Sequence, residues 1–320
     1  MCRLFGFRSR VESRVHKSLI SADNALIQQS DRHPDGWGVA YFVDGAPHVI
    51  KSTDAAGSDQ LFHRVSGVAT SDTVLAHLRK ATQGGLTIVN THPFQYGRWV
   101  FAHNGNVANF AALRPALLAR IAPDLRRYIL GRGDSEVLFY SLLTRLQQRT
   151  SLGATDIASS DLAAAAREAI ADLCGLAGPS HPDDSGPPDR TYLTFLLTNG
   201  EVMLAHQGGK SLFVSTHKTV CSERANCPEY RPSCEAPVQG EAPSHLLFSS
   251  EPLQGENAWD ALEFGEIAVA DRDLQLIRVP AHADLAPNER APRRLHVVGS
   301  RGIASRPTDR PNHHPRQRSQ

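Results

Sequence analysis

Short apolar runs separated by turn residues constrain this chain more than any other feature of its sequence. Asn199-Gly200 lies between the apolar runs 191–198 and 201–206, and Asp44-Gly45 lies between the runs 39–42 and 47–51. An Asn-Gly or Asp-Gly pair flanked by apolar runs is typical of a β-hairpin. Further short strands are expected at residues 2–7, 73–78, 98–102, 212–215, 245–249, 264–270 and 274–279.

Four longer segments have the apolar spacing of helices. They are residues 18–29, 107–121, 137–148 and 161–174, and each places apolar side chains three or four positions apart. Many short strands, few helices and no repeat predict one α+β domain over residues 1–285. Residues 286–320 are rich in proline and arginine, and this composition predicts a disordered tail.

The composition excludes several classes of protein. The net charge is +1 over 320 residues, and 41% of the residues are hydrophobic, as in ordinary globular proteins. The arginine-rich tail has no interleaved aromatic residues, so we expect no nucleic-acid partner. No apolar run approaches the ~18 residues of a membrane span and no signal peptide is evident, so we expect no membrane association and a cytoplasmic location.

Cys2 is the first candidate for chemistry. If Met1 is removed, a thiol and a free α-amine share one carbon atom. The α-amine has an unperturbed pKa of about 7.7–8.0, so it could act as a base for its own thiol, which is a strong nucleophile. The alternative is that Cys2 is a small apolar residue of a buried first strand.

Polar residues that could complete such a site follow the predicted strands or begin a predicted helix. Asn104-Gly105 could supply an amide and a backbone N–H to an oxyanion, and Arg79 could bind a carboxylate. Each residue also has an ordinary interpretation, since Arg79 could be a surface cation, Asn104-Gly105 a turn and Asp134 a helix cap. The full set comprises Arg79, Thr82, His92, Asn104, Gly105 and Asp134.

Six motifs, in order, make this sequence similar to class II glutamine amidotransferases, whose nucleophile is an N-terminal cysteine. They are Met1-Cys2-Arg3-Leu4-Phe5-Gly6, His33-Pro34-Asp35-Gly36-Trp37-Gly38, Ala76-His77-Leu78-Arg79-Lys80-Ala81-Thr82, Asn90-Thr91-His92-Pro93-Phe94, Ala102-His103-Asn104-Gly105 and Gly133-Asp134-Ser135-Glu136. Residues 249–253, Trp259 and Gly265-Glu266 resemble the C-terminal part of stand-alone members of that family. Lys80 and Gln83-Gly84 depart from the pattern of the larger members.

The resemblance implies a four-layer αββα sandwich of two stacked antiparallel sheets. It also implies that Cys2 attacks a γ-glutamyl amide, with Asn104 and Gly105 holding the oxyanion. The α-carboxylate of the substrate would bind Arg79 and Thr82, its α-ammonium would bind Asp134, and His92 would shape the pocket. No metal or organic cofactor is implied.

The sequence leaves three functions open. We expect hydrolysis of a small-molecule γ-glutamyl substrate through a thioester, because the chain has no second domain large enough to use ammonia. It could instead be a glutaminase subunit that delivers ammonia to a partner protein, or a non-catalytic regulatory protein. Cys221, Cys227 and Cys234 lack the usual spacing of zinc ligands, and we expect them to be unpaired, with a zinc site or a disulfide as alternatives.

Overall fold

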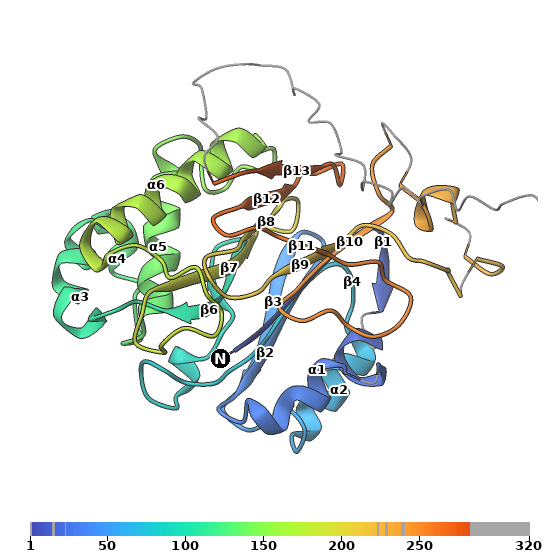
Figure 1. Ribbon diagram of the computed structural model, residues 1–320, viewed down its shortest axis with the longest axis horizontal. Coiled ribbons are helices and arrows are strands. Elements are labelled where there is room, and N and C mark those ends of the chain that lie inside the picture. Colours follow the sequence, from blue (N-terminus) through green and yellow to red (C-terminus); the bar gives the residue numbers. More distant parts are fainter. Residues whose placement is uncertain are drawn as a thin grey trace, which may run out of the picture. The chain divides into compact units, whose positions relative to one another are not determined.

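Two antiparallel sheets lie face to face, and helices cover the outer face of each sheet (Figure 1). This computed structural model describes residues 2–14, 17–22, 24–222, 224–227, 230–237 and 241–281. The tail expected at residues 286–320 lies outside the described residues, so the tail and the domain boundary at residue 285 remain predictions.

The first sheet has seven strands and contains the N-terminal strand near its middle. Its order is β11-β9-β10-β1-β4-β2-β3, and all of its pairs are antiparallel. In that order the strands are Asp260–Ala261, Phe213–Ser215, His245–Ser249, Arg3–Arg14, Thr70–Leu78, Trp37–Val43 and Ala46–Ser52.

The second sheet has six strands in the order β13-β12-β8-β7-β6-β5, again all antiparallel. These strands are Leu276–Val279, Ile267–Ala270, Met203–His206, Tyr192–Thr198, Trp99–Asn106 and Phe94–Tyr96. The predicted hairpin at Asn199-Gly200 is confirmed, because β7 pairs with β8 across it.

Alternating side chains explain why the sheets stack. Leu4 of β1 packs in the apolar layer between the two sheets, whereas Phe5 packs on the opposite face. Similarly, Val100 and Ala102 of β6 face the layer between the sheets, and Phe101 faces the helices. A strand places successive side chains on opposite faces, so each of these strands contributes to two cores. The αββα sandwich implied by the resemblance is therefore confirmed.

The helices are unequally divided between the two outer faces. The six-stranded sheet is covered by α3 (Phe110–Ala119), α4 (Pro123–Arg126), α5 (Asp134–Gln147) and α6 (Ser159–Ala177). The seven-stranded sheet is covered by α1 (Leu26–Gln29) and α2 (Gln60–Val68). Short turns of 3₁₀-helix lie at Ser30–Arg32, Ile88–Asn90 and Pro232–Cys234, and a π-helical turn lies at Lys17–Ser21.

Two predictions of local structure were wrong. The helix expected at residues 18–29 is split into the π-helical turn and the single turn of α1, because Ala25 between them is extended (ψ 163°). Asn104-Gly105 does not follow a strand, but lies inside β6, where Asn104 is opposite Thr194 of β7. The turn interpretation of Asn104-Gly105 is therefore also wrong.

Candidate active site

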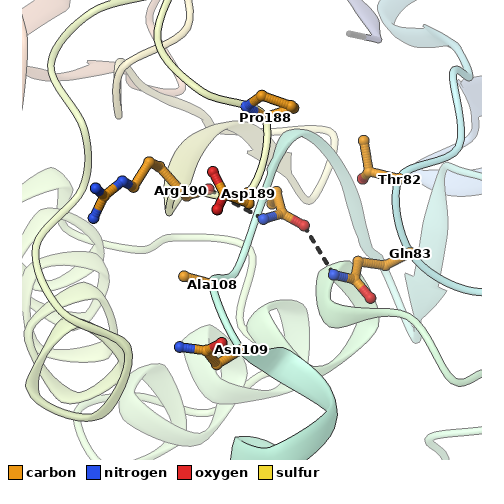
Figure 2. A pocket seen from close by; sticks show the side chains of 8 residues that line it. Thr82, Gln83, Ala108, Asn109, Pro188, Asp189 and Arg190 are labelled. Carbon is orange, nitrogen blue, oxygen red and sulfur yellow. Dashed lines mark hydrogen bonds between the residues drawn. The ribbon is translucent and has the colours of Figure 1, made fainter.

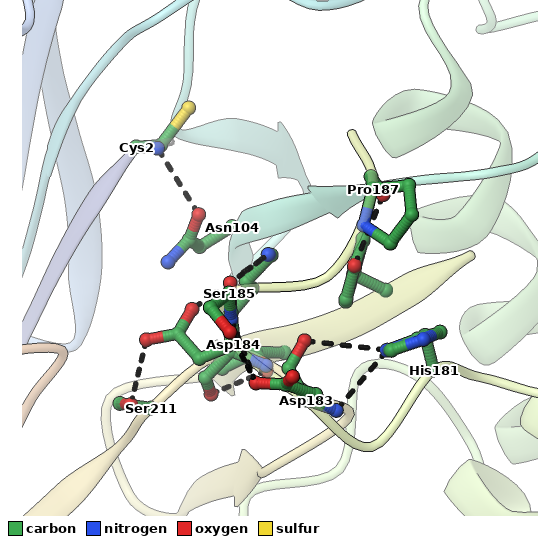
Figure 3. Close-up of polar contacts among 12 residues, drawn as sticks. Cys2, Asn104, His181, Asp183, Asp184, Ser185, Pro187 and Ser211 are labelled. Atoms are coloured by element: carbon green, nitrogen blue, oxygen red, sulfur yellow. Dashed lines mark hydrogen bonds and ion pairs between the residues drawn. The ribbon is translucent and has the colours of Figure 1, made fainter. Parts of the chain in front are cut away.

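Cys2 directly precedes β1, and its backbone nitrogen and its thiol have separate partners. The nitrogen donates a hydrogen bond to Asn104 Oδ1 at 3.0 Å (Figure 3). The thiol contacts the backbone of Lys80, donating to its carbonyl oxygen at 3.4 Å and accepting from its N–H at 3.3 Å. Burial raises the pKa of the Cys2 thiol, and the Lys80 N–H acts in the opposite direction. The thiol therefore needs a nearby base to ionise at neutral pH.

Asn104 and Gly105 are held in place because they lie in the part of β6 that pairs with β7. The Asn104 Oδ1 atom accepts from Cys2, which leaves the amide NH₂ to donate elsewhere. A Cβ atom at Gly105 would lie 2.0 Å from Tyr192 O and 2.2 Å from His103 Nε2. Only glycine therefore fits at this position without a shift of the backbone.

Arg79 lies at the end of β4 with its guanidinium covered by the loop that follows. Its side chain donates to the carbonyl oxygens of Gln83 and Gly85, both at 3.2 Å, and only 3% of the residue is exposed. Arg79 is therefore not a surface cation, which excludes its ordinary interpretation. Thr82, from the same loop, is exposed.

Asp134 is the first residue of α5, and Gly133 is the N-cap. Its carboxylate accepts from the backbone N–H of Val107 at 2.7 Å and from that of Ser135 at 2.8 Å. Asp134 thus joins the end of β6 to the start of α5. This structural role does not use all of the acceptor positions of a carboxylate, which can accept about four hydrogen bonds.

His92 is buried in a layer of aromatic side chains. Its ring centroid lies 4.2 Å from that of His77 and 4.7 Å from that of Phe94, and neither ring nitrogen has a hydrogen-bond partner among the described residues. Burial lowers the pKa of His92 well below its usual value. The ring is therefore neutral at physiological pH and forms part of an uncharged wall.

His103 is a residue of the site that the sequence analysis quoted in a motif but did not select. Its Nδ1 lies 2.9 Å from Ser135 Oγ and its Nε2 lies 2.9 Å from Tyr192 O. These contacts connect β6 to both α5 and β7. The signal was its position next to Asn104 in a strand that is buried over almost its whole length.

Most of the predicted residues surround one small cavity, which we call the inner cavity. Its volume is about 20 Å³, which is room for about one water molecule. Asn104 is the one predicted residue that does not line it, and it reaches the site through its hydrogen bond to Cys2. The predicted residues that line it are Cys2, Arg79, Thr82, His92, Gly105 and Asp134.

A second, larger cavity adjoins the first, and we call it the outer cavity (Figure 2). Its volume is about 520 Å³. Thr82 and Gln83 line both cavities, and Gln83 Nε2 donates to Asn106 Oδ1 at 3.0 Å. The other lining residues are Ala108, Asn109, Pro188, Asp189 and Arg190. The sequence analysis did not predict this cavity.

No group of three or more potential metal ligands occurs among the described residues, and none of the helices described is both long and apolar enough for a membrane span. Cys221, Cys227 and Cys234 are free thiols, as expected, so the alternative of a disulfide between them is not observed. The cytoplasmic location remains a prediction.

Comparison with known proteins gives one consistent family. Residues 1–292 match the family described as glutamine amidotransferases class-II. The chain is 32% identical over 165 residues to the probable glutamine amidotransferase DUG3 of Saccharomyces cerevisiae, covering 46% of each protein. It is also 39% identical over 74 residues to the gamma-glutamyl-hercynylcysteine sulfoxide hydrolase of Mycobacterium tuberculosis, covering 23% of this chain and 32% of that one.

These matches span less than half the length of either curated relative. Among solved structures, a glutamine aminotransferase class-II domain protein from Silicibacter pomeroyi superimposes with a TM-score of 0.58. The two chains are 21% identical, and the superposition covers 87% of this chain and 98% of the other. At this identity the structural likeness supports the fold alone.

Proposed function

The chain belongs to the class II glutamine amidotransferases, and from this membership we propose that it hydrolyses a γ-glutamyl amide bond through a thioester on Cys2. The observation that carries the proposal is the hydrogen bond between the Cys2 nitrogen and Asn104 Oδ1. It supports a site in which Cys2, whose nitrogen becomes an amine once Met1 is removed, lines one cavity together with a buried arginine and a buried aspartate.

In the proposed first half-reaction, the α-amine of Cys2, freed by removal of Met1, takes the thiol proton. The sulfur then attacks the γ-carbonyl carbon of the substrate. The oxyanion that forms is held by the Asn104 NH₂ and the Gly105 N–H. The α-ammonium returns its proton to the amide nitrogen, the C–N bond breaks, and the free amine leaves behind a γ-glutamyl thioester.

In the second half-reaction, water attacks the thioester carbon and gives a proton to the α-amine. The carbon–sulfur bond breaks, glutamate is released, and the sulfur recovers its proton. The buried Arg79 would bind the α-carboxylate of the γ-glutamyl group, with Thr82 beside it. Asp134 would bind the α-ammonium, and neutral His92 would limit the size of the pocket. The reaction requires only water as a co-substrate.

The experiment that tests this proposal is intact-mass analysis of the untagged protein. It is measured before and after reaction with diazo-oxo-norleucine, an electrophilic analogue of glutamine. We expect Met1 to be absent and a single adduct to map to Cys2. Retention of Met1 together with an unlabelled Cys2 would refute the mechanism.

A second candidate function is delivery of ammonia to a partner protein, and one surface favours it. Exposed apolar side chains lie on two neighbouring segments, which are connected by a hydrogen bond of 3.1 Å from the Arg132 N–H to Asn90 Oδ1. Asn90 also lines the inner cavity, so a partner covering these side chains would lie beside the site. They are Leu86, Ile88, Val89, Tyr128 and Leu130, which are between 39% and 74% exposed.

Steady-state hydrolysis distinguishes the two candidates. A hydrolase should reach full turnover as the purified chain. A subunit that delivers ammonia should hydrolyse glutamine slowly alone and faster in a stoichiometric complex with a synthase.

A further inference from the structure

We propose that the outer cavity binds the amine part of the substrate, and that this amine is an amino acid or peptide retaining a free ammonium and a free carboxylate. Asp189 and Arg190 are then specificity-determining residues. This inference rests on the proposed hydrolysis of γ-glutamyl amides, and it names the class of amide that is cleaved.

The position of the outer cavity identifies which part of the substrate it would receive. The γ-glutamyl group requires Arg79 and Asp134, which line the inner cavity only. Thr82 and Gln83 line both cavities, so the path from the inner to the outer cavity passes these two residues. The group attached to the γ-nitrogen would therefore extend into the outer cavity.

The size of the outer cavity argues against ammonia as its occupant. A water molecule, which is similar in size to ammonia, takes up about 30 Å³ of liquid. The outer cavity measures about 520 Å³, within the usual range for pockets that bind organic ligands. The inner cavity has room for about one water molecule, so the γ-glutamyl group would extend into this space, which has room for the atoms of an amine as well.

The lining of the outer cavity identifies the chemistry of its ligand. Pro188 and Ala108 are its only apolar residues, and the rest are amides, a hydroxyl, a carboxylate and a guanidinium. Asp189 and Arg190 are exposed and have no hydrogen bond or ion pair with another described side chain. Two unpaired charges of opposite sign are complementary to a zwitterion.

Figure 2 shows how these charges are arranged. Asp189 lies across the cavity from Thr82 and Gln83, and Arg190 extends farther from them than Asp189 does. Both charged residues line the outer cavity and not the inner cavity. They are placed to bind charged groups at the far end of the amine rather than atoms next to the scissile bond.

The wall that carries Asp189 and Arg190 is fixed by a network of polar contacts (Figure 3). Lys210 Nζ donates to Asp184 O at 2.6 Å, and Ser211 Oγ donates to Asp184 Oδ2 at 2.8 Å. The Tyr192 hydroxyl donates to Pro187 O at 3.0 Å. On the cavity side, Asn106 Nδ2 donates to Arg190 O at 3.1 Å. A wall held before the ligand arrives is typical of a binding site.

The test uses four γ-glutamyl amides built on the same five-carbon stem, with glutamine as a fifth substrate. The amines are lysine attached through its ε-nitrogen, cadaverine, ε-aminocaproate and n-pentylamine. The lysine conjugate carries both an ammonium and a carboxylate. The cadaverine conjugate carries the ammonium alone, the ε-aminocaproate conjugate carries the carboxylate alone, and the pentylamine conjugate carries neither. The measured quantity is kcat/KM for each amide with the wild-type chain and with D189N, R190Q and R64Q.

We expect the lysine conjugate to be the best substrate and the pentylamide the worst of the four, with each charge contributing roughly twofold to fivefold, as exposed ion pairs do. D189N should reduce the preference for cadaverine over pentylamine, and R190Q the preference for ε-aminocaproate over pentylamine. R64Q is the matched control, because Arg64 is an exposed residue of α2 and lines neither cavity. R64Q should leave the ratios of kcat/KM between the amides unchanged.

The possible failures are distinguishable. If none of the five amides is hydrolysed, the proposed function itself fails. If they are hydrolysed with equal kcat/KM, or glutamine is preferred, the hydrolase stands and the assignment of the outer cavity is overturned. If the preference exists but survives in both D189N and R190Q, the charges that create it lie elsewhere, which also overturns the assignment.

Discussion

The inner and outer cavities differ in how many of their charged side chains already form hydrogen bonds within the protein. In the inner cavity, Arg79 donates to two carbonyl groups and the Asp134 carboxylate accepts from two backbone N–H groups. In the outer cavity, Asp189 and Arg190 are exposed and unpaired. A buried, connected site holds reacting groups in one geometry, whereas exposed side chains can be exchanged with little loss of stability. Under the proposed function, the chemistry takes place in the inner cavity and the outer cavity selects the amine.

The largest effect should come from replacing the nucleophile. C2A should reduce hydrolysis of every γ-glutamyl amide by at least about a thousandfold, because it removes the sulfur proposed to form the thioester. The protein should remain folded, since the change removes one sulfur atom. Steady-state rates and thermal unfolding monitored by circular dichroism measure both effects. Residual turnover of a tenth of wild type, or an unfolded variant, would contradict this prediction.

N104A should have the next largest effect. It removes the amide that accepts from the Cys2 nitrogen and the proposed oxyanion donor, so kcat should fall about 10²–10³-fold. N257A is a suitable control, because Asn257 lies in a β-bridge with Lys218 and lines neither cavity. A fall in kcat that is as large in N257A would show that the effect is a general loss of structure.

Acid should destabilise the fold through its buried histidines. Burial lowers the pKa of His77 to about 3 and that of His206 to about 4, whereas an unfolded histidine titrates near 6.5. Between these values the unfolded chain binds more protons, so the free energy of unfolding falls as pH falls below about 6.5. Each histidine should remove about 1.4 kcal/mol per pH unit down to its folded-state pKa.

Urea unfolding at a series of pH values from neutral to about pH 5 measures this dependence. The lining of the outer cavity contains no histidine, so the substrate preferences assigned to it should not change over the range in which the protein stays folded. An unfolding free energy that is constant from pH 7 to pH 5 would contradict the buried, neutral state of these rings.

D134N separates the structural role of Asp134 from its proposed role in binding. The asparagine keeps one carbonyl oxygen as an acceptor but loses the negative charge. We expect KM for γ-glutamyl substrates to rise about tenfold, the usual effect of losing a charged hydrogen bond, while kcat changes little. An unchanged KM would mean that Asp134 only joins β6 to α5.

The sequence predicted the inner cavity far better than the outer one, for a physical reason. Cys2, Arg79 and Asp134 lie at the ends of strands or at the start of a helix, so local patterns and motifs reveal them. Asn104-Gly105 was misplaced because this pair is typical of turns, and only pairing with β7 keeps it in a strand. No helix or strand was predicted for residues 175–190, and nothing local shows that Asp189 and Arg190 line a cavity together with Thr82.

Local sequence patterns also failed to predict the structure of two helical segments. α2 was not predicted, although Asp59 caps it by accepting from the Leu61 N–H at 2.8 Å. Its nine residues are too few for a clear periodic signal. The expected helix at residues 18–29 contains Ala25, which is buried and has an extended backbone.

The smallest effect is expected from K210M, a variant that tests whether the two cavities act independently. Lys210 is 4% exposed, lies 3.5 Å from the Tyr192 ring centroid and donates to Asp184 O. Its backbone is also bound by Thr194 Oγ1, which donates to Lys210 O at 2.8 Å, and Thr194 lies opposite Asn104.

K210M keeps the stem and the backbone contacts but removes the ammonium. The preference for the lysine conjugate over the pentylamide should then fall about threefold, because the wall is less well held. An equal fall in kcat for every amide, glutamine included, would instead show that Lys210 acts through Thr194 on Asn104, and that the two cavities are coupled.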